Sequence, residues 1–415
     1  MSQDTLAYED ALRIVLAART RLPAQACPTT ACLGRVLAEP LVSKVDLPPF
    51  DNSAMDGFAL RGDAVVPAGA ERDVEGEQAA GDGIAHARHG AWEIMTGARL
   101  PDGLDRVIPV EQTERLSSSR IRLLADVTPG QNVRHAGSDV RRGQTVLAAG
   151  TTLAPQHLML LASLGLGDVS VIERPRVAVL CTGRELVDDP AQTLSPGQIR
   201  NSNGPFLAAR LPLAGADVVH VETVGDDAVA FEAALRRALD AGAQLIISSG
   251  AVSMGRYDFV PQALEHIGAE TLFHKVAIRP GKPLLCARLP GNALLFGLPG
   301  NPIAVAVGLR FFVEPALRVM LGLPQEMPRR VPLFNAYSKK PRLRFHLKSR
   351  LRIDGEGRLA IEVLGGQESY RIQPLADANA WAVVPADIDA LAAGSLVDVY
   401  GPGHLEFPLP CESPI

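Results

Sequence analysis

The chain has 415 residues, of which 47% are hydrophobic and 21% charged, with 38 glycines, 32 prolines and a formal net charge of −5. That length is too great for one ordinary core, so the chain is predicted to form three or four domains rich in turns. The net negative charge excludes a general attraction to nucleic acid or to an anionic membrane, so any bound anion must be held by a local basic cluster.

The N-terminal segment is predicted to be largely helical over residues 1–40 and to end in a short strand near Arg35–Leu41. Tyr8 and Leu12 fall on one apolar face at helical spacing, which indicates a core-facing helix and not a secretory signal. The five cysteines of the chain form no CxxC pair. This argues against a disulfide framework or a zinc site and is typical of a protein of the reducing cytoplasm.

Residues 47–143 have a different sequence pattern, in which Gly, Pro and Asp separate short runs of alternating apolar and polar residues. These runs predict a small β-rich domain. Strands are expected at Trp92–Met95, Arg106–Val110 and Ile121–Leu124. The flanking segments 1–46 and 144–175, with a helix over Pro155–Leu166, are expected to form a discontinuous, elongated linking domain.

Strands and helices alternate through residues 176–323, and this pattern predicts an α/β domain built from parallel βαβ units. The expected strands are Val177–Leu180, Val218–Val221, Leu245–Ser249 and Leu294–Phe296. The expected helices are Gly204–Leu211, Ala228–Ala241 and a segment that ends at Met320. The apolar stretch Leu294–Leu317 contains prolines and Arg310, so it is predicted to be a buried strand, a loop and a helix and not a membrane span.

The last part of the chain, residues 324–415, begins with a linker at Pro324–Pro328 and is predicted to be a C-terminal β-barrel-like domain. Its expected strands are Leu343–Ile353, Leu359–Leu364 and Leu396–Tyr400. The predicted fold class is therefore multidomain α/β plus β, with a central α/β domain, a small β-rich domain, a mixed linking domain and a C-terminal β domain.

Three turns follow predicted strands of the α/β domain. They are Thr182-Gly183-Arg184-Glu185, Ser249-Gly250-Ala251-Val252-Ser253 and Gly297-Leu298-Pro299-Gly300-Asn301-Pro302. Each offers backbone N–H groups and small side chains at the carboxyl end of a strand, where ligands of such sheets bind. Any one of them alone is also compatible with an ordinary tight turn, but three in one domain favour an anion-binding site.

Three acidic residues close to these turns are candidate ligands of a divalent cation, namely Glu185, Asp226 and Asp258. Mg²⁺ prefers oxygen ligands and commonly bridges carboxylates to substrate phosphates. A second interpretation applies to Asp226 and Asp227, which could simply cap the helix that begins at Ala228.

A basic segment over residues 275–283 is a candidate for holding an anionic substrate. Lys275 and Arg279 fall on one face of a predicted extended segment, and Lys282 follows a Pro-Gly turn. Clusters of Lys and Arg are commonly solvated surface features. The residues that flank this cluster are apolar and turn-forming, which favours a fixed position.

The segment PPFDNSAMDGFAL, which begins at Pro48, carries two carboxylates, Asp51 and Asp56, and predicts a structured polar loop. It strongly resembles the signature of the molybdopterin molybdenumtransferase family, which includes the E domain of gephyrin. The resemblance covers nearly the whole chain and continues through Met95-Thr96-Gly97-Ala98, Gly137-Ser138-Asp139, Thr182-Gly183, Asp226-Asp227, Ser249-Gly250, Lys275–Pro283 and Leu298–Pro302.

The resemblance implies a fold and an activity. Such proteins are homodimers of four-domain chains, and one domain resembles the molybdopterin adenylyltransferase fold. Their active cleft lies between that domain of one subunit and the small β domain of the other. The substrates are adenylylated molybdopterin and molybdate, and the reaction uses Mg²⁺ to cleave AMP while the dithiolene captures molybdate. Expected partner proteins are the molybdopterin adenylyltransferase and recipient molybdoenzymes.

The resemblance also assigns roles to residues of this chain, position by position. The positions expected to be catalytic are Asp56, Thr96, Glu185, Asp226, Asp258, Lys275 and Arg279. The positions expected to bind the substrate are Asp139, Thr182, Gly183, Ser249, Gly250, Lys282, Pro299, Gly300, Asn301 and Pro302. The expected ligands of Mg²⁺ are Glu185, Asp226 and Asp258.

Six positions depart from the common family pattern. Arg184 replaces an Asp, Ala251 a Gly, Arg256 an acidic residue, Arg200 a Tyr, Asn201 an Asp and Arg279 a Lys. The pocket is therefore expected to be more positive than is typical. These departures leave the core acids intact and put the oxyanion preference, and activity itself, in question.

The alternative hypothesis is a non-catalytic relative that binds molybdopterin or holds a partner enzyme, as the scaffold role of gephyrin's E domain shows to be feasible. Acids beside bound anions cost repulsion unless a metal offsets it. The retention of Asp56, Glu185, Asp226, Asp258 and Lys275 therefore favours the enzyme. The sequence does not distinguish molybdate from tungstate, nor does it name the recipient enzymes.

Overall fold

The computed structural model describes residues 5–252, 259–340, 342–353 and 356–412. The chain divides into two compact units. Unit 1 consists of Met1–Gln25, Gly34–Ala38 and Val171–Ile415, and unit 2 of Ala26–Leu33 and Glu39–Ser170. No helix in the described part of the chain is long and apolar enough to cross a membrane. The apolar stretch from Leu294 is a strand, a turn and a helix, as its prolines predict.

Unit 1 is built around a six-stranded sheet with the order β16-β13-β17-β21-β20-β18. The strands are β13 (Arg176–Thr182), β16 (Asp217–Val224), β17 (Leu245–Ser249), β18 (Glu270–His274), β20 (Leu285–Arg288) and β21 (Leu294–Leu298). The first four in this order are parallel, as predicted, and β20 is antiparallel to both of its neighbours, β21 and β18. The sequence pattern does not predict β18 and β20. Gly291 and Asn292, both at positive φ, turn the chain directly from β20 into β21 with no helix between.

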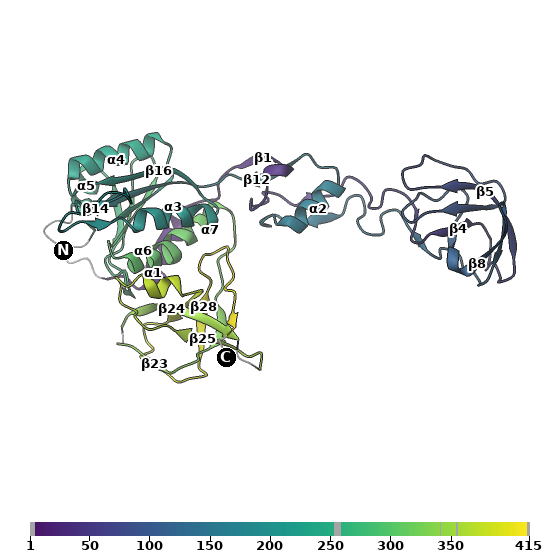
Figure 1. Cartoon of the computed structure of the whole chain (residues 1–415). Helices are drawn as coiled ribbons and strands as arrows, with labels where there is room; N and C mark the ends of the chain where they lie inside the picture. Colours follow the sequence, from purple (N-terminus) through teal and green to yellow (C-terminus); the bar gives the residue numbers. More distant parts are fainter. Residues whose placement is uncertain (1–4, 253–258, 341, 354–355, 413–415) are drawn as a thin grey trace. The chain divides into compact units, whose positions relative to one another are not determined.

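Helices cover both faces of this sheet (Figure 1). One face carries α4 (Ala228–Asp240) and α5 (Val260–His266). The other carries α1 (Tyr8–Ala17), α3 (Asn203–Leu213), α6 (Pro302–Gly308) and α7 (Glu314–Met320), and the π-helical η3 (Leu309–Val313) joins the last two. The two apolar layers leave only the edges of the sheet, and the ends of its strands, for polar function.

The N-terminal segment departs from its predicted helix. From residue 5 to residue 40 the structure has only α1 as an α-helix, because Pro23 and Pro28 interrupt helical hydrogen bonding. Residues 24–28 instead form β1 (Ala24–Pro28), which pairs with β12 (Asp168–Ile172). The strand expected near Arg35–Leu41 is reduced to a bridge between Leu37 and Val171 and the short β2 (Leu41–Val42).

The C-terminal part of unit 1 is a second, seven-stranded sheet with the central order β19-β24-β26-β28-β22, and β25 and β29 pair with β24. Its strands are β19 (Ile278–Arg279), β22 (Arg329–Pro332), β24 (Arg344–Ile353), β25 (Leu359–Val363), β26 (Ala380–Val384), β28 (Leu396–Tyr400) and β29 (Cys411–Glu412). A core of buried aliphatic side chains such as Leu347 and Val397 packs on it. The three strands expected in this region are present.

Unit 2 contains a six-stranded sheet with the order β7-β4-β6-β5-β9-β8. Its strands are β4 (Gly57–Leu60), β5 (Glu71–Gln78), β6 (Ala91–Ile94), β7 (Arg106–Pro109), β8 (Thr113–Ser117) and β9 (Arg120–Leu123). The rest of the unit includes β3 (Asn52–Ser53), which pairs with β10 (Val133–Arg134), β11 (Thr145–Leu147), which pairs with β2, and α2 (Pro155–Ser163). The observed architecture is thus multidomain α/β plus β.

Candidate functional site

The three predicted turns meet at one end of the α/β sheet. β13, β17 and β21 are adjacent and parallel, so the turns that follow them emerge side by side. Together they line a cleft of about 740 Å³. The predicted residues that line it are Thr182, Gly183, Glu185, Asp226, Ser249, Gly250, Gly300, Asn301 and Pro302. This is the position at which open parallel sheets bind ligands.

Two of these turns are in direct backbone contact at Gly250. Its N–H donates to the carbonyl of Leu298 at 2.9 Å, and the Thr182 hydroxyl donates to the carbonyl of Ser249 at 3.1 Å. Gly250 has φ +98°, and a Cβ built on it would lie 2.6 Å from both the carbonyl and the hydroxyl oxygen of Thr182. Only glycine fits this approach of one turn to the next.

Gly250→Ala is therefore expected to lower the free energy of unfolding by on the order of 2 kcal/mol, because the new methyl group meets backbone and the φ is unfavourable. Urea denaturation measures the loss. Gly225→Ala is the matched control, since a Cβ there has no neighbour within 4 Å and should change stability little. Equal midpoints for the two variants would contradict the close packing of the turns.

The carboxylate of Glu185 folds back over the first turn. A Cβ built on Gly183 would lie 2.7 Å from each of its two oxygens. The carboxylate of Asp226 accepts a long hydrogen bond, 3.4 Å, from the backbone N–H of Arg184. Both acids thus sit at the turn that follows β13, beside the backbone N–H groups of the cleft.

The neighbouring acid, Asp227, has the structural role. Its Oδ1 accepts a 2.7 Å hydrogen bond from the backbone N–H of Ala230 and caps α4. The capping interpretation therefore applies to Asp227, whereas Asp226 lines the cleft.

The donor atoms of the cleft fit a hard divalent cation. Glu185 and Asp226 supply carboxylate oxygens, and Asp258 lies outside the described residues. Within the residues that are described, no group of three or more His, Cys, Asp or Glu side chains forms a metal site. Mg²⁺ is commonly held by one or two carboxylates together with substrate phosphates and water, so this pair suits a cation that binds with its substrate.

Two asparagines that the sequence did not single out as site residues order another wall of the cleft. The Asn203 amide donates to the carbonyl of Gly300 at 2.9 Å. The Asn201 amide donates to Asp188 at 2.9 Å, and its carbonyl oxygen accepts from the N–H of Gly204 at 3.0 Å. The only hint in the sequence was that this segment departs from the family pattern.

The C-terminal sheet also contributes to the cleft through Tyr370 and Ile372, which precede α8 (Gln373–Ala376). No local motif marks these two residues. The carbonyl of Ser369 accepts a 3.0 Å hydrogen bond from the N–H of Ile303, in the first turn of α6. This bond ties the segment to the turn that follows β21.

The structure does not place the predicted basic residues among those that line the cleft within its described part. Lys275 is half-buried and has φ +78°, so the chain turns there, whereas Ile278–Arg279 (β19) is extended as predicted. Arg279 is exposed and its guanidinium lies over the ring of Phe345, 5.4 Å from the centroid. Lys282 is also exposed, and its carbonyl accepts from the N–H of Val276 at 2.9 Å.

In unit 2, the structure brings Asp56 and Thr96 together. Oδ1 of Asp56 accepts hydrogen bonds from the backbone N–H of Thr96 at 2.6 Å and from its hydroxyl at 2.7 Å. These two bonds, the backbone one foremost, hold the pKa of Asp56 below its usual value. The carboxylate is therefore ionised and fixed in direction at neutral pH.

The same polar loop is fastened by Asp51. Its carboxylate accepts from the N–H of Ala136 at 2.7 Å and pairs with Nδ1 of His135 at 3.1 Å. Burial works to raise the pKa of Asp51, but these two partners bring it below the usual value. Asp139 is exposed, and its backbone N–H donates to the carbonyl of Leu47 at 2.9 Å. Asp51 thus orders the loop that presents Asp56.

The departures from the family pattern have distinct surroundings. Arg184 is exposed and does not line the described part of the cleft. Arg200 lines it, and its guanidinium donates to the carbonyls of Asp189, at 2.6 Å, and Gln192. Ala251 adopts φ +51°, a conformation that suits the glycine usual there. Arg256 lies outside the described residues.

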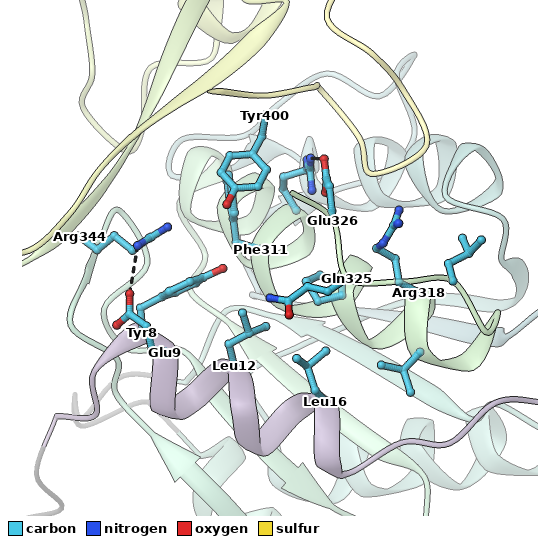
Figure 2. Close-up of a pocket in the computed structure, with 14 residues that line it drawn as sticks. Tyr8, Glu9, Leu12, Leu16, Phe311, Arg318, Gln325, Glu326, Arg344 and Tyr400 are labelled. Carbon is cyan, nitrogen blue, oxygen red and sulfur yellow. Dashed lines mark hydrogen bonds and ion pairs between the residues drawn. The ribbon is translucent and has the colours of Figure 1, made fainter. Parts of the chain in front are cut away.

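A second cavity of unit 1, of about 330 Å³, lies between α1, the η3–α7 segment and the C-terminal sheet (Figure 2). Leu12 and Leu16 of α1 point into it, and Arg344 above them pairs with Glu9 at 3.1 Å. None of the predicted site residues is among the described residues that line it. Of these two cavities, only the first cleft is lined by predicted site residues.

Three family models match the chain. They are described as the MoeA N-terminal region (domain I and II), over residues 6–165, a probable molybdopterin binding domain, over residues 178–319, and the MoeA C-terminal region (domain IV), over residues 330–401. The second match contains all three turns and both described acids of the cleft.

Curated relatives match over almost their full length. A molybdopterin molybdenumtransferase of Synechococcus elongatus is 38% identical over 404 residues, which cover 95% of this chain and 99% of the relative. A molybdopterin molybdenumtransferase 2 of Mycobacterium tuberculosis is 37% identical, with 90% and 94% covered. The crystal structure of a molybdopterin biosynthesis MoeA protein from Pyrococcus horikoshii is similar with a TM-score of 0.82 and 27% identity, covering 96% of this chain and 99% of that one.

Proposed function

Because the chain belongs to the MoeA family of molybdopterin molybdenumtransferases, we propose that it inserts molybdenum into adenylylated molybdopterin and releases AMP. The observation that carries this proposal is the cleft of the α/β sheet. It combines three turns at the ends of parallel strands with the carboxylates of Glu185 and Asp226. Anion-binding turns beside carboxylates suit a phosphate ester that arrives with a cation.

The proposed substrate explains this combination of groups. Adenylylated molybdopterin carries a phosphoanhydride, and molybdate is a second anion, so the site must offset repulsion between them. Backbone N–H groups of the turns that follow β13, β17 and β21 can do so without mobile side chains, apart from those of Gly183, Gly250 and Ile303, which donate to protein carbonyls. We assign the phosphate-binding role to Thr182, Gly183, Ser249 and Gly250 and to the segment Pro299–Pro302.

We further assign Glu185 and Asp226 as carboxylates that would hold Mg²⁺, with Asp258 as the third ligand expected from the sequence. When bound there, Mg²⁺ would neutralise charge on the phosphates and on the departing AMP. The only basic residue that lines the described part of the cleft is Arg200, and its guanidinium donates to the carbonyls of Asp189 and Gln192 and not to the acids. That balance supports a cation as the missing positive charge.

Other assignments rest on the family resemblance alone. We propose that Asp56 and Thr96 act as one hydrogen-bonded pair in the reaction, and that Asp139, Lys275, Arg279 and Lys282 contact the substrates. The ionised state of Asp56 supports its part of this proposal, because a carboxylate fixed by two donors is preorganised to orient a reacting group.

We also propose that the protein is a homodimer. Light scattering should then report twice the 44.1 kDa mass of one chain at micromolar concentration. A single species with the mass of one chain over this concentration range would contradict the dimer.

The direct test of the proposed function is AMP release from adenylylated molybdopterin in the presence of molybdate, with and without a chelator of divalent cations. We expect AMP release that depends on molybdate and is lost with the chelator. The alternative, a non-catalytic scaffold, predicts binding of the pterin and no AMP under any metal. Complementation of a strain that lacks this activity, scored by a molybdoenzyme assay, tests the same conclusion in cells.

A further inference from the structure

Three apolar side chains stand exposed at the edge of the cleft. Ile199, Tyr370 and Ile372, here called the apolar rim, are 53%, 63% and 46% exposed, and all three line the cleft. Exposed apolar groups that gather beside a polar pocket are typical of a binding surface. Phosphate and molybdate are hydrated anions, so their recognition gives these side chains no role.

The rim is drawn from two parts of unit 1. Ile199 belongs to β15 (Ile199–Arg200), which pairs with β14 (Leu186–Val187) directly after Glu185. Its N–H donates to the carbonyl of Glu185 at 2.8 Å. Tyr370 and Ile372 belong to the segment 366–372, here called the rim loop.

A buried lysine holds the rim loop. Lys348 of β24 has no exposed surface, and its ammonium donates to three carbonyls of this loop, those of Gly366 at 2.6 Å, Arg371 at 3.0 Å and Glu368 at 3.4 Å. A desolvated charge is costly unless its hydrogen bonds are made. The hydrogen bonds of the Lys348 ammonium are made with backbone carbonyls of the rim loop. Its charge is therefore compensated only while the rim loop keeps this conformation.

A side-chain amide and a backbone contact fasten the same loop. Gln367 accepts from the N–H of Lys348 at 3.1 Å and donates to its carbonyl at 2.8 Å. The carbonyl of Ser369 accepts from the N–H of Ile303 at 3.0 Å. The rim loop is therefore fixed at both faces, against β24 and against α6. Tyr370 stands between these two attachments, at the cleft.

We propose that the apolar rim binds the flat face of a heteroaromatic ring of the substrate, with Tyr370 as the stacking residue and Lys348 as its positioning residue. The chemistry required is a planar ring joined to a phosphate, which both the pterin and the adenine of the proposed substrate possess. The proposal deepens the proposed function and rests on it for the identity of the ring. It does not depend on AMP release.

The geometry favours a ring over other occupants. The turns at the ends of β13, β17 and β21 hold the phosphate end, and the rim flanks them in the same cleft. Stacking on an aromatic side chain contributes about 1–3 kcal/mol to the binding of a base. A loss at the lower part of that range, about 1.4 kcal/mol, corresponds to a tenfold change in Kd.

The first experiment measures binding, without turnover, of two probes, AMP and molybdopterin without its adenylyl group. One of the two probes has the ring that stacks on Tyr370. For that probe, Tyr370→Ala is expected to raise the Kd about tenfold, and the Kd of the other probe should stay nearly unchanged. Tyr370→Phe keeps the ring and should bind like the wild type. Phe407→Ala is the matched control, because Phe407 is 71% exposed in the same unit and does not line the cleft.

The second experiment tests the positioning role. Lys348→Met should raise the Kd of the same probe as Tyr370→Ala does, and the double variant should be no weaker than Tyr370→Ala alone. Lys339→Met is the control, since Lys339 donates to the carbonyls of Leu343 and Ala386, which lie just outside strands β24 and β26 and away from the rim loop. Gln367→Leu, which releases the loop without removing a charge, replaces Lys348→Met if that variant does not fold.

The outcomes separate this proposal from the proposed function. Unchanged affinity of Tyr370→Ala for both probes would overturn the stacking role, whatever the wild type does with AMP. Equal losses for Lys348→Met and Lys339→Met would overturn the positioning role. If the wild-type protein binds either probe through Tyr370 but never releases AMP, the proposed enzymatic activity is wrong and the stacking role of the apolar rim is retained.

Discussion

Asp226→Asn is expected to lower the rate of AMP release by about 10²-fold, the scale of losing one group that stabilises charge in the transition state. The substitution keeps the shape of the side chain and removes its charge beside the turn after β13, where Asp226 shares the cleft with Glu185. Binding of molybdopterin should survive, because the backbone turns remain. The measurement is AMP release at saturating molybdate, with molybdopterin binding determined separately.

The neighbouring Asp227 provides the control. Asp227→Asn retains the cap of α4, since asparagine caps helices about as well as aspartate, so activity and stability should match the wild type. Full activity of Asp226→Asn would remove this residue from the metal site and would leave the enzyme assignment standing. Equal losses in the two variants would mean that the loop acts as a whole and that neither carboxylate has a separate role.

Arg310→Met is expected to lower the free energy of unfolding of unit 1 by about 3–5 kcal/mol, the scale of leaving a buried charge unpaired. Arg310 is 2% exposed and pairs with Glu326 at 2.6 Å and Glu314 at 3.4 Å, and it donates to the carbonyl of Gly401 at 3.0 Å. Methionine fills the space but satisfies none of these oxygens. Urea denaturation measures the loss.

The pH dependence sharpens this test. Burial raises the pKa of Glu314 to about 7, although Arg310 and Arg210 act to lower it. A carboxyl whose pKa is raised by folding adds stability below its unfolded pKa of about 4.5 and loses it as the pH rises through 7. Without Arg310 the ionised form of Glu314 is even less favourable in the folded protein. Arg310→Met should therefore lower the free energy of unfolding more at pH 8 than at pH 5.

Two further variants complete the comparison. Adding Glu314→Gln to Arg310→Met removes the unpaired carboxylate and should recover part of the loss at pH 8. Arg329→Met is the exposed control and should change stability little. A loss of the same size at pH 5 and pH 8 would mean that Glu314 is not the group left uncompensated.

The elements of the central sheet were predictable where the local signal and the tertiary environment agree. β17 is a β-branched and apolar run that ends in Ser-Gly, and it is found at its predicted residues, Leu245–Ser249. α4 begins directly after a capping Asp227 and buries one face, which includes Phe231 and Leu235. Burial on both faces of the sheet favours the same strands and helices as the local sequence does, so the sequence pattern is enough to predict them.

The antiparallel edge of that sheet and the rim of the cleft were not predictable in this way. β20 pairs with β21 through a hairpin and with β18 across the segment between them, and short strands of this kind have no periodicity of their own. Tyr370 and Ile372 reach the cleft only because Lys348 and Ile303 hold their loop. Such placement is decided by tertiary contacts, which local propensity does not encode.

The resemblance located residues that physical reasoning alone did not. The polar loop of Asp56 was predicted to be structured, but its partner Thr96 came only from the family pattern, and the two are hydrogen-bonded. For the basic residues, the family pattern and the structure do not agree in this way. Lys275, Arg279 and Lys282 match the pattern, yet the described part of the cleft does not include them, so their roles remain predictions for binding experiments.

The contacts of α1 have a consequence for the order in which the protein is made on the ribosome. α1 is synthesised well before its neighbours: Leu6, just before the helix, pairs with Val276, the ring of Tyr8 lies 5.4 Å from that of Phe312, and Glu9 pairs with Arg344, 335 positions further on. All of unit 2, which is a compact unit, is translated in between. The apolar face of α1 must therefore wait uncovered while a whole unit is completed, and this makes it a natural site for chaperone binding during translation.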